Sequence, residues 1–307
     1  TIPELLKRGY DEKTTIGSLA GSSTLGFLIP PSIIMIVYGV AADVSITRLF
    51  IAGVLPGAML MALFMGYLAI WSMLNPSKVP PRDERVPIMR RIWETRKLFP
   101  IVALMIAVIG SIYMGIATAT EAAAVGVVGA LLIALLTGSL NRKSFIDSVL
   151  GATRTSVMVS FILAGAAFLS TAMGFTGIPR ELAAWVGTLG LDKFELLLAL
   201  TLLFIVLGCF LDGISIVVLT AAVIMPITQQ AGIDPIWFGI FIVVVIEMSQ
   251  ITPPVGINLF ILQSMTGRNI WEVAKAAFPF FMLLVVATIL LIVFPEIATW
   301  LPDTIRQ

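Results

Sequence analysis

The sequence has no histidine, a single cysteine and little charge. Without histidine there can be no Ser-His hydrolase, histidine-ligated metal site or histidine proton relay. One cysteine, Cys209, can form neither an internal disulfide nor a thiolate metal cluster. Charged residues make up 12% of the 307 residues, and the 19 basic residues nearly balance the 18 acidic ones. This composition excludes a water-soluble globular fold and leaves no basic field for nucleic acid.

Long apolar runs occupy most of the chain, which is 59% hydrophobic with a mean hydropathy of +1.05. A membrane-spanning helix needs about 20 mostly apolar residues. The stretches without a charged residue are 14–42, 49–77, 98–120, 122–141, 155–179, 196–211, 213–233, 235–246, 248–267 and 276–295. This pattern predicts an all-α integral membrane protein that crosses the bilayer several times.

Three places in this pattern hold residues that interrupt a helix. The first holds GSLAGSST followed by Pro30-Pro31, and a later one holds Thr252-Pro253-Pro254-Val255-Gly256. Between two short apolar runs, Leu211-Asp212-Gly213 predicts the tip of a re-entrant hairpin over 196–229. Irregular backbone at membrane depth is tolerated only where it is buried in protein or lines a cavity. The three interruptions are therefore the first candidates for a functional site.

The loops predict an orientation in the membrane. The loop 78–97 has 7 Lys/Arg against 3 Asp/Glu, and the turn 141–143 is Asn-Arg-Lys, so both are expected in the cytoplasm. Segment 180–195 has no basic excess and is expected outside. A short amphipathic surface helix is predicted in the first loop from its apolar residues Ile88, Ile92, Trp93 and Phe99; an ordinary loop is the alternative.

The chain also repeats itself. A shift of 223 residues (226 − 3) aligns the segment from Pro3 with the segment from Pro226 without a gap. The matched pairs are mainly residues that interrupt or end helices: Pro3/Pro226, Gly9/Gly232, Asp11/Asp234, Pro30/Pro253, Pro31/Pro254 and Pro56/Pro279. Four predicted spans separate the two copies, so the broken helices are expected to run in opposite directions. Paired, inverted broken helices are typical of secondary transporters with a site at the midplane.

The second copy is preceded by the hairpin 196–229, so the first copy should be preceded by one as well. Only its tail, Thr1–Lys7, is present, and the chain does not begin with Met. We therefore expect the chain to be an N-terminally incomplete part of a longer protein.

Five motifs resemble the large membrane subunit of tripartite ATP-independent periplasmic (TRAP) transporters along essentially the whole chain. They are GSLAGSSTLGFLIPPSIIMIVYGV, DVSITRLFIAGVLPG, GIATATEAAAVGVVGA, LGCFLDGISIVVLTAAVIMPI and ITPPVGINLFILQSM. The resemblance implies an elevator-type transporter in the bacterial inner membrane rather than an enzyme. It also implies sodium as coupling ion with no organic cofactor. The implied partners are a small membrane subunit, membrane lipid, and a periplasmic binding protein that delivers an organic acid such as sialic acid or a four-carbon dicarboxylate.

The resemblance and the repeat together suggest a division of the chain. The transport domain would comprise the end of the first hairpin with the first broken helix, and the second hairpin with the second broken helix. Scaffold helices, one followed by the amphipathic arm 78–98, and linking helices would form the rest. The corresponding ranges are 1–48 and 194–267 for transport and 49–116 and 268–307 for scaffold. The linking helices over 117–193 would belong partly to the scaffold and partly to the transport domain.

Oxygen ligands suit sodium, and the carbonyls of unwound helices supply them, whereas helix N-termini face anionic substrates. The candidate sodium ligands are Gly21, Ser22, Gly26, Asp212, Gly213, Thr252, Val255 and Gly256. The candidate substrate-binding residues are Ser22, Ser23, Thr24, Ser215 and Asn258. For the hydroxyl residues of the first copy, helix capping or small-residue packing is the alternative.

Four ionisable residues lie in or near apolar spans, where each is a functional candidate. Asp212 is assigned to an ion site, because a carboxylate at membrane depth is costly unless a cation partners it. The other three have structural alternatives to a functional role. Glu121 could stabilise a helix N-terminus, and Arg154 could extend to the membrane interface by snorkelling. Glu247 could form a hydrogen bond between helices.

Three other functions fit parts of the pattern. A stand-alone sodium–dicarboxylate carrier would share the broken helices but need no binding protein. An intramembrane aspartyl protease would need a second carboxylate beside Asp212, for which Glu247 is the only candidate, and it would leave the repeat unexplained. A passive channel would move substrate without sodium.

Overall fold

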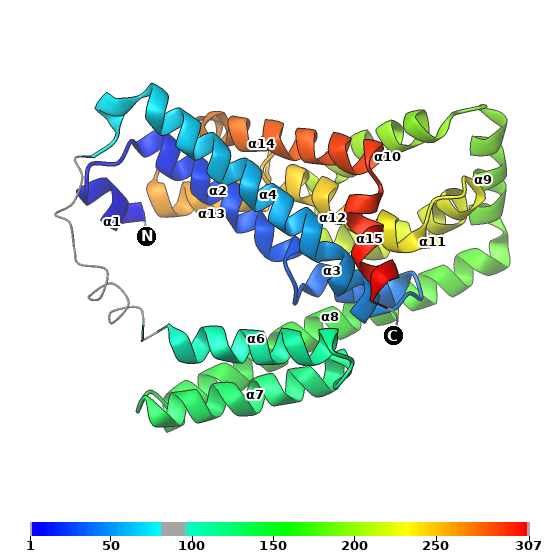
Figure 1. The fold of residues 1–307 in the computed structure, drawn as a ribbon. Coiled ribbons are helices and arrows are strands. Elements are labelled where there is room, and N and C mark those ends of the chain that lie inside the picture. The colour runs from blue at the N-terminus through cyan, green and yellow to red at the C-terminus, as the bar shows by residue number, and fades with distance from the viewer. Residues whose placement is uncertain (1, 81–95, 97, 306–307) are drawn as a thin grey trace. The chain divides into compact units, whose positions relative to one another are not determined.

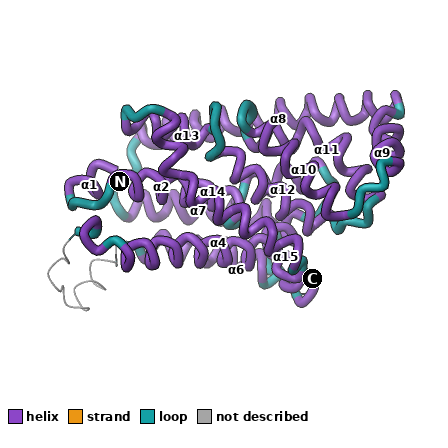
Figure 2. Tube along the Cα trace, turned by 90° about the horizontal axis from the view of Figure 1, so that it is seen from above, coloured by secondary structure: helices purple, strands orange, loops and turns teal. Residues whose placement is uncertain are grey.

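The computed structural model describes residues 2–80, 96 and 98–305, and these residues form helices joined by short loops, without strands. Figure 2 shows the same helical character along the traced chain. The chain divides into two compact units, residues 1–80 with 162–306, and residues 81–161 with 307. The all-α fold class is confirmed.

The larger unit holds both sequence repeats. Its helices are α1 (Ile2–Lys7), α2 (Glu12–Leu28), α3 (Ile33–Ala41), α4 (Ile46–Leu74), the short 3₁₀ helix η1 (Pro76–Lys78), α9 (Ile178–Thr188), α10 (Lys193–Gly208), α11 (Gly213–Gln230), α12 (Pro235–Gln250), α13 (Ile257–Thr266), α14 (Ile270–Val293) and α15 (Glu296–Thr304).

The first broken helix consists of α2 and α3, which meet at an angle of 41°. Pro30 and Pro31 have no N–H, so the helical hydrogen bonds that would run from these positions cannot form. Ser32 begins the next helix: its hydroxyl accepts a hydrogen bond from Met35 N at 3.3 Å and donates one to the Phe27 carbonyl. The proline pair thus ends one helix, and the serine starts the next.

The second broken helix consists of α12 and α13, separated by residues 251–256 with Pro253-Pro254 in the middle. Helix α2 contacts α13, and α3 contacts α12, which is the pattern of two broken helices that lie antiparallel. Figure 1 shows α2–α3 running from left to right and α12–α13 from right to left. The predicted opposite directions are confirmed.

The repeat extends to the helix ends. Asp11 and Asp234 are the N-caps of α2 and α12, and each side chain accepts a hydrogen bond from the backbone N–H three residues on. Gly9 and Gly232 precede them with φ of 83° and 65°. Helices α4 and α14 follow the two broken helices and contact both of them. Turn glycines, N-cap aspartates and prolines at matching positions therefore produce the same order of elements in both copies.

The smaller unit contains α6 (Phe99–Tyr113), α7 (Ala119–Leu136) and the beginning of α8 (Arg142–Thr176), whose end belongs to the larger unit. Helices α6 and α7 pack closely, because a Cβ on Gly129 would lie 2.3 Å from Leu104 Cδ1. Helix α7 starts with a capping box between Thr118 and Glu121.

Among the described residues, five helices are long and apolar enough to cross a membrane: α4, α7, α8, α11 and α14. The bent pair α2–α3 makes a sixth candidate. Helix α11 meets this length criterion although the sequence predicts it as half of a re-entrant hairpin. These helices confirm a multi-pass membrane protein.

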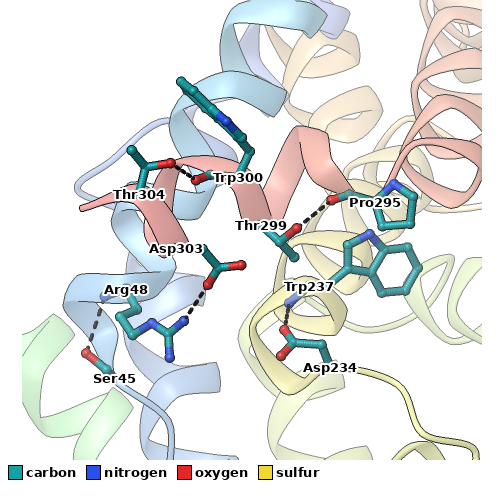
Figure 3. Close-up of polar contacts among 9 residues, drawn as sticks. All are labelled: Ser45, Arg48, Asp234, Trp237, Pro295, Thr299, Trp300, Asp303 and Thr304. Carbon is teal, nitrogen blue, oxygen red and sulfur yellow. Dashed lines mark hydrogen bonds and ion pairs between the residues drawn. The ribbon is translucent and has the colours of Figure 1, made fainter. Parts of the chain in front are cut away.

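Two helices were not expected from the sequence. Helix α9 occupies part of the 180–195 segment, which we expected to be a loop, and α15 follows the last span. Arg48 Nη2 lies 3.0 Å from Asp303 Oδ1 and so links the start of α4 to α15 (Figure 3). The amphipathic helix predicted around Ile88–Trp93 falls outside the described residues.

Candidate functional site

The tip of the hairpin rests against the break of the second broken helix. Helices α10 and α11 are joined by residues 209–212. Cys209 Sγ donates to the Pro253 carbonyl at 3.2 Å, and Gln250 Nε2 lies 3.5 Å from the Leu211 carbonyl. The structure therefore brings together two of the three interruptions that the sequence identified as candidates for a functional site.

The same tip also contacts the first broken helix. A Cβ on Gly213 would lie 2.5 Å from Ile34 Cδ1 of α3 and 2.9 Å from Ile246 Cγ2 of α12. Only a residue without a side chain fits between them. The first residue of α11 is therefore held between the two broken helices.

Asp212, expected to hold an ion, is the N-cap of α11. Its Oδ2 accepts hydrogen bonds from Ile214 N at 3.1 Å and Ser215 N at 3.2 Å, and Ser215 Oγ donates to its Oδ1. The helix N-terminus and the Ser215 hydroxyl therefore partner this carboxylate. The argument that Asp212 needs a cation as its partner is weakened, and its ion-binding role stays a prediction. Ser215 is positioned by the same contact.

Backbone carbonyls converge in the second break. Gly256 has φ of 44°, and a Cβ on it would lie 2.7 Å from the Thr252 carbonyl oxygen and 2.9 Å from that of Gln250. Pro254 has no N–H to bond the Gln250 carbonyl as a helix would. Thr252 Oγ1 donates to the Met248 carbonyl at 2.7 Å, which leaves its lone pairs available. Two carbonyls and a hydroxyl in one turn form a donor set of the kind that sodium prefers.

Asn258 lies in the first turn of α13, just after the break. Its side chain is 9% exposed, and its Nδ2 has no hydrogen-bond partner. Helix α13 has no side-chain cap, because its N-cap residue is Gly256. The amide donor and the uncapped N–H groups are both suited to an acceptor such as a carboxylate. The Val255 side chain has no polar atom, so only its backbone carbonyl is a candidate ligand.

The candidates in the first copy lie inside α2, not in unwound backbone. The GSLAGSST segment stays helical, because the helix ends only at the proline pair. Our expectation that residues 21–26 form the break is wrong in this respect. Gly21 packs against α14, since a Cβ there would lie 2.5 Å from Phe280 Cδ1. Gly26 precedes Pro30 by four residues, so its carbonyl lacks a helical donor and remains a candidate ligand.

The three hydroxyl residues of this segment bond their own helix. Ser22 Oγ lies 3.4 Å from the Leu19 carbonyl, and Ser23 Oγ lies 2.8 Å from that of Ala20. Thr24 Oγ1 lies 2.8 Å from the Gly21 carbonyl. These contacts are those of hydroxyl groups packed within a membrane helix, the alternative that the sequence left open.

Thr24 also faces Glu247, and both residues are 0% exposed. Thr24 Oγ1 lies 3.5 Å from Glu247 Oε2, whereas Glu247 Oε1 has no partner. This is the hydrogen bond between helices that the sequence offered as an alternative to an ion site. The carboxyl group joins α12 to α2 in the interior.

The other two ionisable candidates lie elsewhere. Glu121 Oε2 accepts hydrogen bonds from Thr118 N at 2.8 Å and Thr118 Oγ1 at 2.9 Å, so it stabilises the start of α7. Arg154 lies on α8 and is exposed.

Sequence reasoning missed Ser32, Ser249 and Gln250, all buried at the breaks. Ser32 had a usable signal, because a serine after a proline pair is a typical N-cap. Ser249 abuts the hairpin: a Cβ on Gly208 would lie 1.9 Å from Ser249 Oγ. Gln250 carried no such signal, because its counterpart Phe27 is apolar. Ser32 bonds the Phe27 carbonyl, but Val255, at the position equivalent to Ser32, has no hydroxyl to bond the Gln250 carbonyl.

Within the described ranges, no group of three or more His, Cys, Asp or Glu side chains could hold a metal ion. A transition-metal centre therefore finds no ligand set there. The carbonyls of the second break suit only a hard cation.

Comparison with known proteins gives a consistent family. The family described as "Tripartite ATP-independent periplasmic transporter, DctM component" matches residues 1–297. The C4-dicarboxylate TRAP transporter large permease protein DctM of Pseudomonas aeruginosa is 35% identical over 98% of this chain and 70% of its own length. The ectoine TRAP transporter large permease protein TeaC of Halomonas elongata is 34% identical over 98% of this chain and 70% of its own length.

The isethionate TRAP transporter permease protein DctMQ of Oleidesulfovibrio alaskensis is 33% identical over 97% of this chain. The match spans 47% of that protein, just under half of its length. These relatives are transporter permeases, which points away from an enzyme and toward import of a substrate across the membrane. The chain therefore belongs to the family of TRAP transporter large permeases, which are integral membrane proteins.

Proposed function

We propose that this permease imports an organic acid by coupling it to sodium entry. The supporting observation is the contact between the hairpin tip and the second break, where carbonyl oxygens converge beside an uncapped helix N-terminus. A sodium ion in this break would be held by the carbonyls of Gln250 and Thr252, with Val255 supplying a third. Gly256 permits this geometry, because any side chain there would occupy the space between the carbonyls.

The substrate would bind next to the ion. The names of the relatives give a four-carbon dicarboxylate, isethionate and ectoine as their substrates. All three compounds carry a carboxylate or a sulfonate. The Asn258 amide and the N–H groups of α13 suit such a group, and the nearby cation would add to the attraction. We include sialic acid and four-carbon dicarboxylates in the substrate class for the same reason.

Ion occupancy would stabilise the closed hairpin. Cys209 and Leu211 of the tip contact residues of the break directly. An ion that fixes the backbone of the break would therefore also favour the docked position of the tip. By linkage, substrate would then strengthen sodium binding by the same factor as sodium strengthens substrate binding. Asp212 would contribute in one of two ways: by stabilising the N-terminus of α11, which it caps, or by attracting the ion with its negative charge.

Transport would follow an elevator mechanism in which the hairpin and broken helices move together. The sequence assigned 268–307 to a scaffold. However, a Cβ on Gly17 of α2 would lie 2.1 Å from the Ala276 carbonyl oxygen of α14, and such tight packing favours α14 moving with α2. Cross-linking α2 to α14 should therefore leave transport intact.

The partners in this proposal are a small membrane subunit and a periplasmic binding protein that delivers the substrate. The alternative is a stand-alone sodium–dicarboxylate carrier. Uptake of succinate into vesicles containing the purified permease with its small membrane subunit, with and without the binding protein, separates them. Uptake that needs no binding protein favours the carrier.

The ion site is tested by the sodium dependence of that uptake. Asp212→Asn should reduce the dependence, because it removes the charge and keeps the cap. Asp192→Asn is the matched control, since Asp192 caps α10 through the same bond to the N–H three residues on. Unchanged sodium dependence in Asp212→Asn would make the ion role of Asp212 wrong. Uptake independent of sodium in the parent protein would favour a passive channel.

A further inference from the structure

A cavity lies beside the beginning of α2, away from the breaks against which the hairpin tip rests. It has a volume of about 570 Å³ and is formed where the beginning of α2, the end of α4 with η1, and the beginning of α14 meet. None of the candidate sodium or substrate residues lines it. It is therefore a separate site on the same unit.

The inner wall of this cavity is apolar and aromatic. Phe280 is buried at its base, and the Tyr67 ring packs edge-on against it with centroids 5.3 Å apart. Trp71 of α4 and Ile16 of α2 complete this wall. Tyrosine and tryptophan rings are enriched where apolar spans meet the polar headgroup region.

The rim, in contrast, is charged and mainly basic. Arg268 forms a two-pronged ion pair with Glu12, with Nε 2.9 Å from Oε1 and Nη2 2.8 Å from Oε2. Asp11 is occupied as the N-cap of α2, where its Oδ2 accepts from Thr14 N at 2.9 Å. Two of the three carboxylates on the rim thus already have partners.

Three lysines remain on the rim: Lys13, Lys78 and Lys275, all exposed. In the described part of the chain, none of them forms an ion pair. The charges of Asp11 and Glu272 offset part of theirs, and the rim keeps one basic group in excess. The inner wall of the cavity is aromatic and apolar, and its rim carries an excess of basic charge. This amphipathic lining suits an anionic lipid better than a small polar solute.

Its position in the chain points to the cytoplasmic leaflet. Helix α4 leads from this cavity into the loop 78–97, whose excess of basic residues predicts a cytoplasmic location. The opposite end of α4 is the Arg48–Asp303 contact of Figure 3. The cavity is therefore expected at the height of the inner-leaflet headgroups, where anionic lipids are available.

We propose that this cavity binds the phosphate-ester headgroup of an anionic phospholipid. Lys13 and Lys275 would contact the phosphate from α2 and α14, and the aromatic wall would cover the upper part of the acyl chains. The lipid would join α2 to α14, beside the Arg268–Glu12 pair that links α2 to the turn before α14. Basic pockets between membrane helices on the cytoplasmic side are known to bind acidic headgroups.

The test is lipid retention by the purified full chain, measured by native mass spectrometry after exchange into mixed phosphatidylglycerol and phosphatidylcholine. The parent protein should retain phosphatidylglycerol preferentially. Lys13→Gln and Lys275→Gln should each weaken that retention about fivefold, the contribution of one lysine near an anionic surface. Glu272→Gln should strengthen it, because it removes the opposing charge.

Lys143→Gln is the matched control, since Lys143 is an exposed lysine in the first turn of α8, in a segment that is also expected in the cytoplasm. Unchanged helical circular dichroism verifies folding of each variant. Equal loss in Lys143→Gln, or no loss in the cavity variants, overturns the proposal. If inorganic phosphate displaces phosphatidylglycerol, the site takes a free anion instead, and the lipid assignment is wrong.

Discussion

Thr24 and Glu247 meet in the interior of the protein, with Thr24 Oγ1 3.5 Å from Glu247 Oε2. Their numbers differ by 223, the spacing of the sequence repeat. Each residue is thus the counterpart of the other. A residue can touch its own counterpart only close to the axis that relates the two copies. The contact therefore marks that axis, where one copy supplies a hydroxyl and the other a carboxyl group.

This pair should contribute to stability. Thr24→Val removes the hydrogen-bond partner of Glu247 Oε2, so that among the described residues neither carboxyl oxygen has a partner. Burying an unsatisfied polar group costs about 1–3 kcal/mol, so the variant should unfold at lower temperature or denaturant concentration in detergent.

The control is Thr201→Val in α10, because Thr201 also bonds a carbonyl of its own helix, that of Leu197 at 2.8 Å. In a Glu247→Leu background, the cost of Thr24→Val should fall to that of the control. Equal costs for the two threonines in the parent protein would show that the interhelical contact adds nothing.

The sequence predicted the broken helices, the hairpin and the inverted repeat because prolines, glycines and caps act locally. Pro30-Pro31 and Pro253-Pro254 remove backbone donors wherever the chain places them. The extent of the first break was wrong for a related reason. Residues 21–26 are small and polar, but small residues also let helices approach, and Gly21 is in contact with Phe280 of α14.

The partner of Asp212 could not be deduced from composition. The sequence contains no nearby basic side chain, but the N–H groups of Ile214 and Ser215 serve the same purpose. Backbone donors are present at every helix start and carry no sequence signal of their own. The convergence of the Gln250 and Thr252 carbonyls likewise depends on the path of the loop and not on the identity of either side chain.

Replacing Gly256 should disturb the break more than replacing another glycine with positive φ. Gly256→Ala places a Cβ 2.7 Å from the Thr252 carbonyl oxygen at φ of 44°. Gly267→Ala has comparable backbone strain at φ of 67° but no atom within 4 Å. Strain alone costs about 1–2 kcal/mol, and overpacking adds about 1–3 kcal/mol.

Gly256→Ala should therefore be the less stable variant in thermal unfolding, and only it should lose sodium-dependent uptake. If both alanine variants behave alike, the crowding of carbonyls around Gly256 has no role beyond the turn.

Stability should also depend on the charge of Asp11 at the start of α2. Burial raises the pKa of Asp11, but hydrogen bonds from Thr14 and the charges of Lys78 and Lys13 outweigh it, so the pKa lies below its ordinary value. A carboxyl group whose pKa is lowered by folding stabilises the folded state above its unfolded pKa. That contribution is lost as the pH falls through the folded pKa.

The parent protein should consequently be more stable than Asp11→Asn at neutral pH, by about 0.3–1 kcal/mol as for other charges at helix N-termini. The difference should disappear in acid. Thermal unfolding in detergent from about pH 3 to pH 7 measures it. A difference that stays constant over this range would mean that shape, not charge, distinguishes the two side chains.

The docking of the hairpin on α12 depends on the absence of a side chain at residue 208. A Cβ on Gly208 would lie 1.9 Å from Ser249 Oγ and 2.3 Å from Ser249 Cβ. Gly208→Ala should therefore push the hairpin away from α12, lower stability by about 1–3 kcal/mol and reduce transport. Adding Ser249→Gly removes both clashing atoms and should restore most of the loss. Glycine is acceptable there, because the equivalent residue of the first copy is Gly26.

Gly165→Ala, in open space on α8, should be neutral or slightly stabilising as the control. Failure of the double variant to recover would mean that Gly208 is required for a reason other than its contact with Ser249.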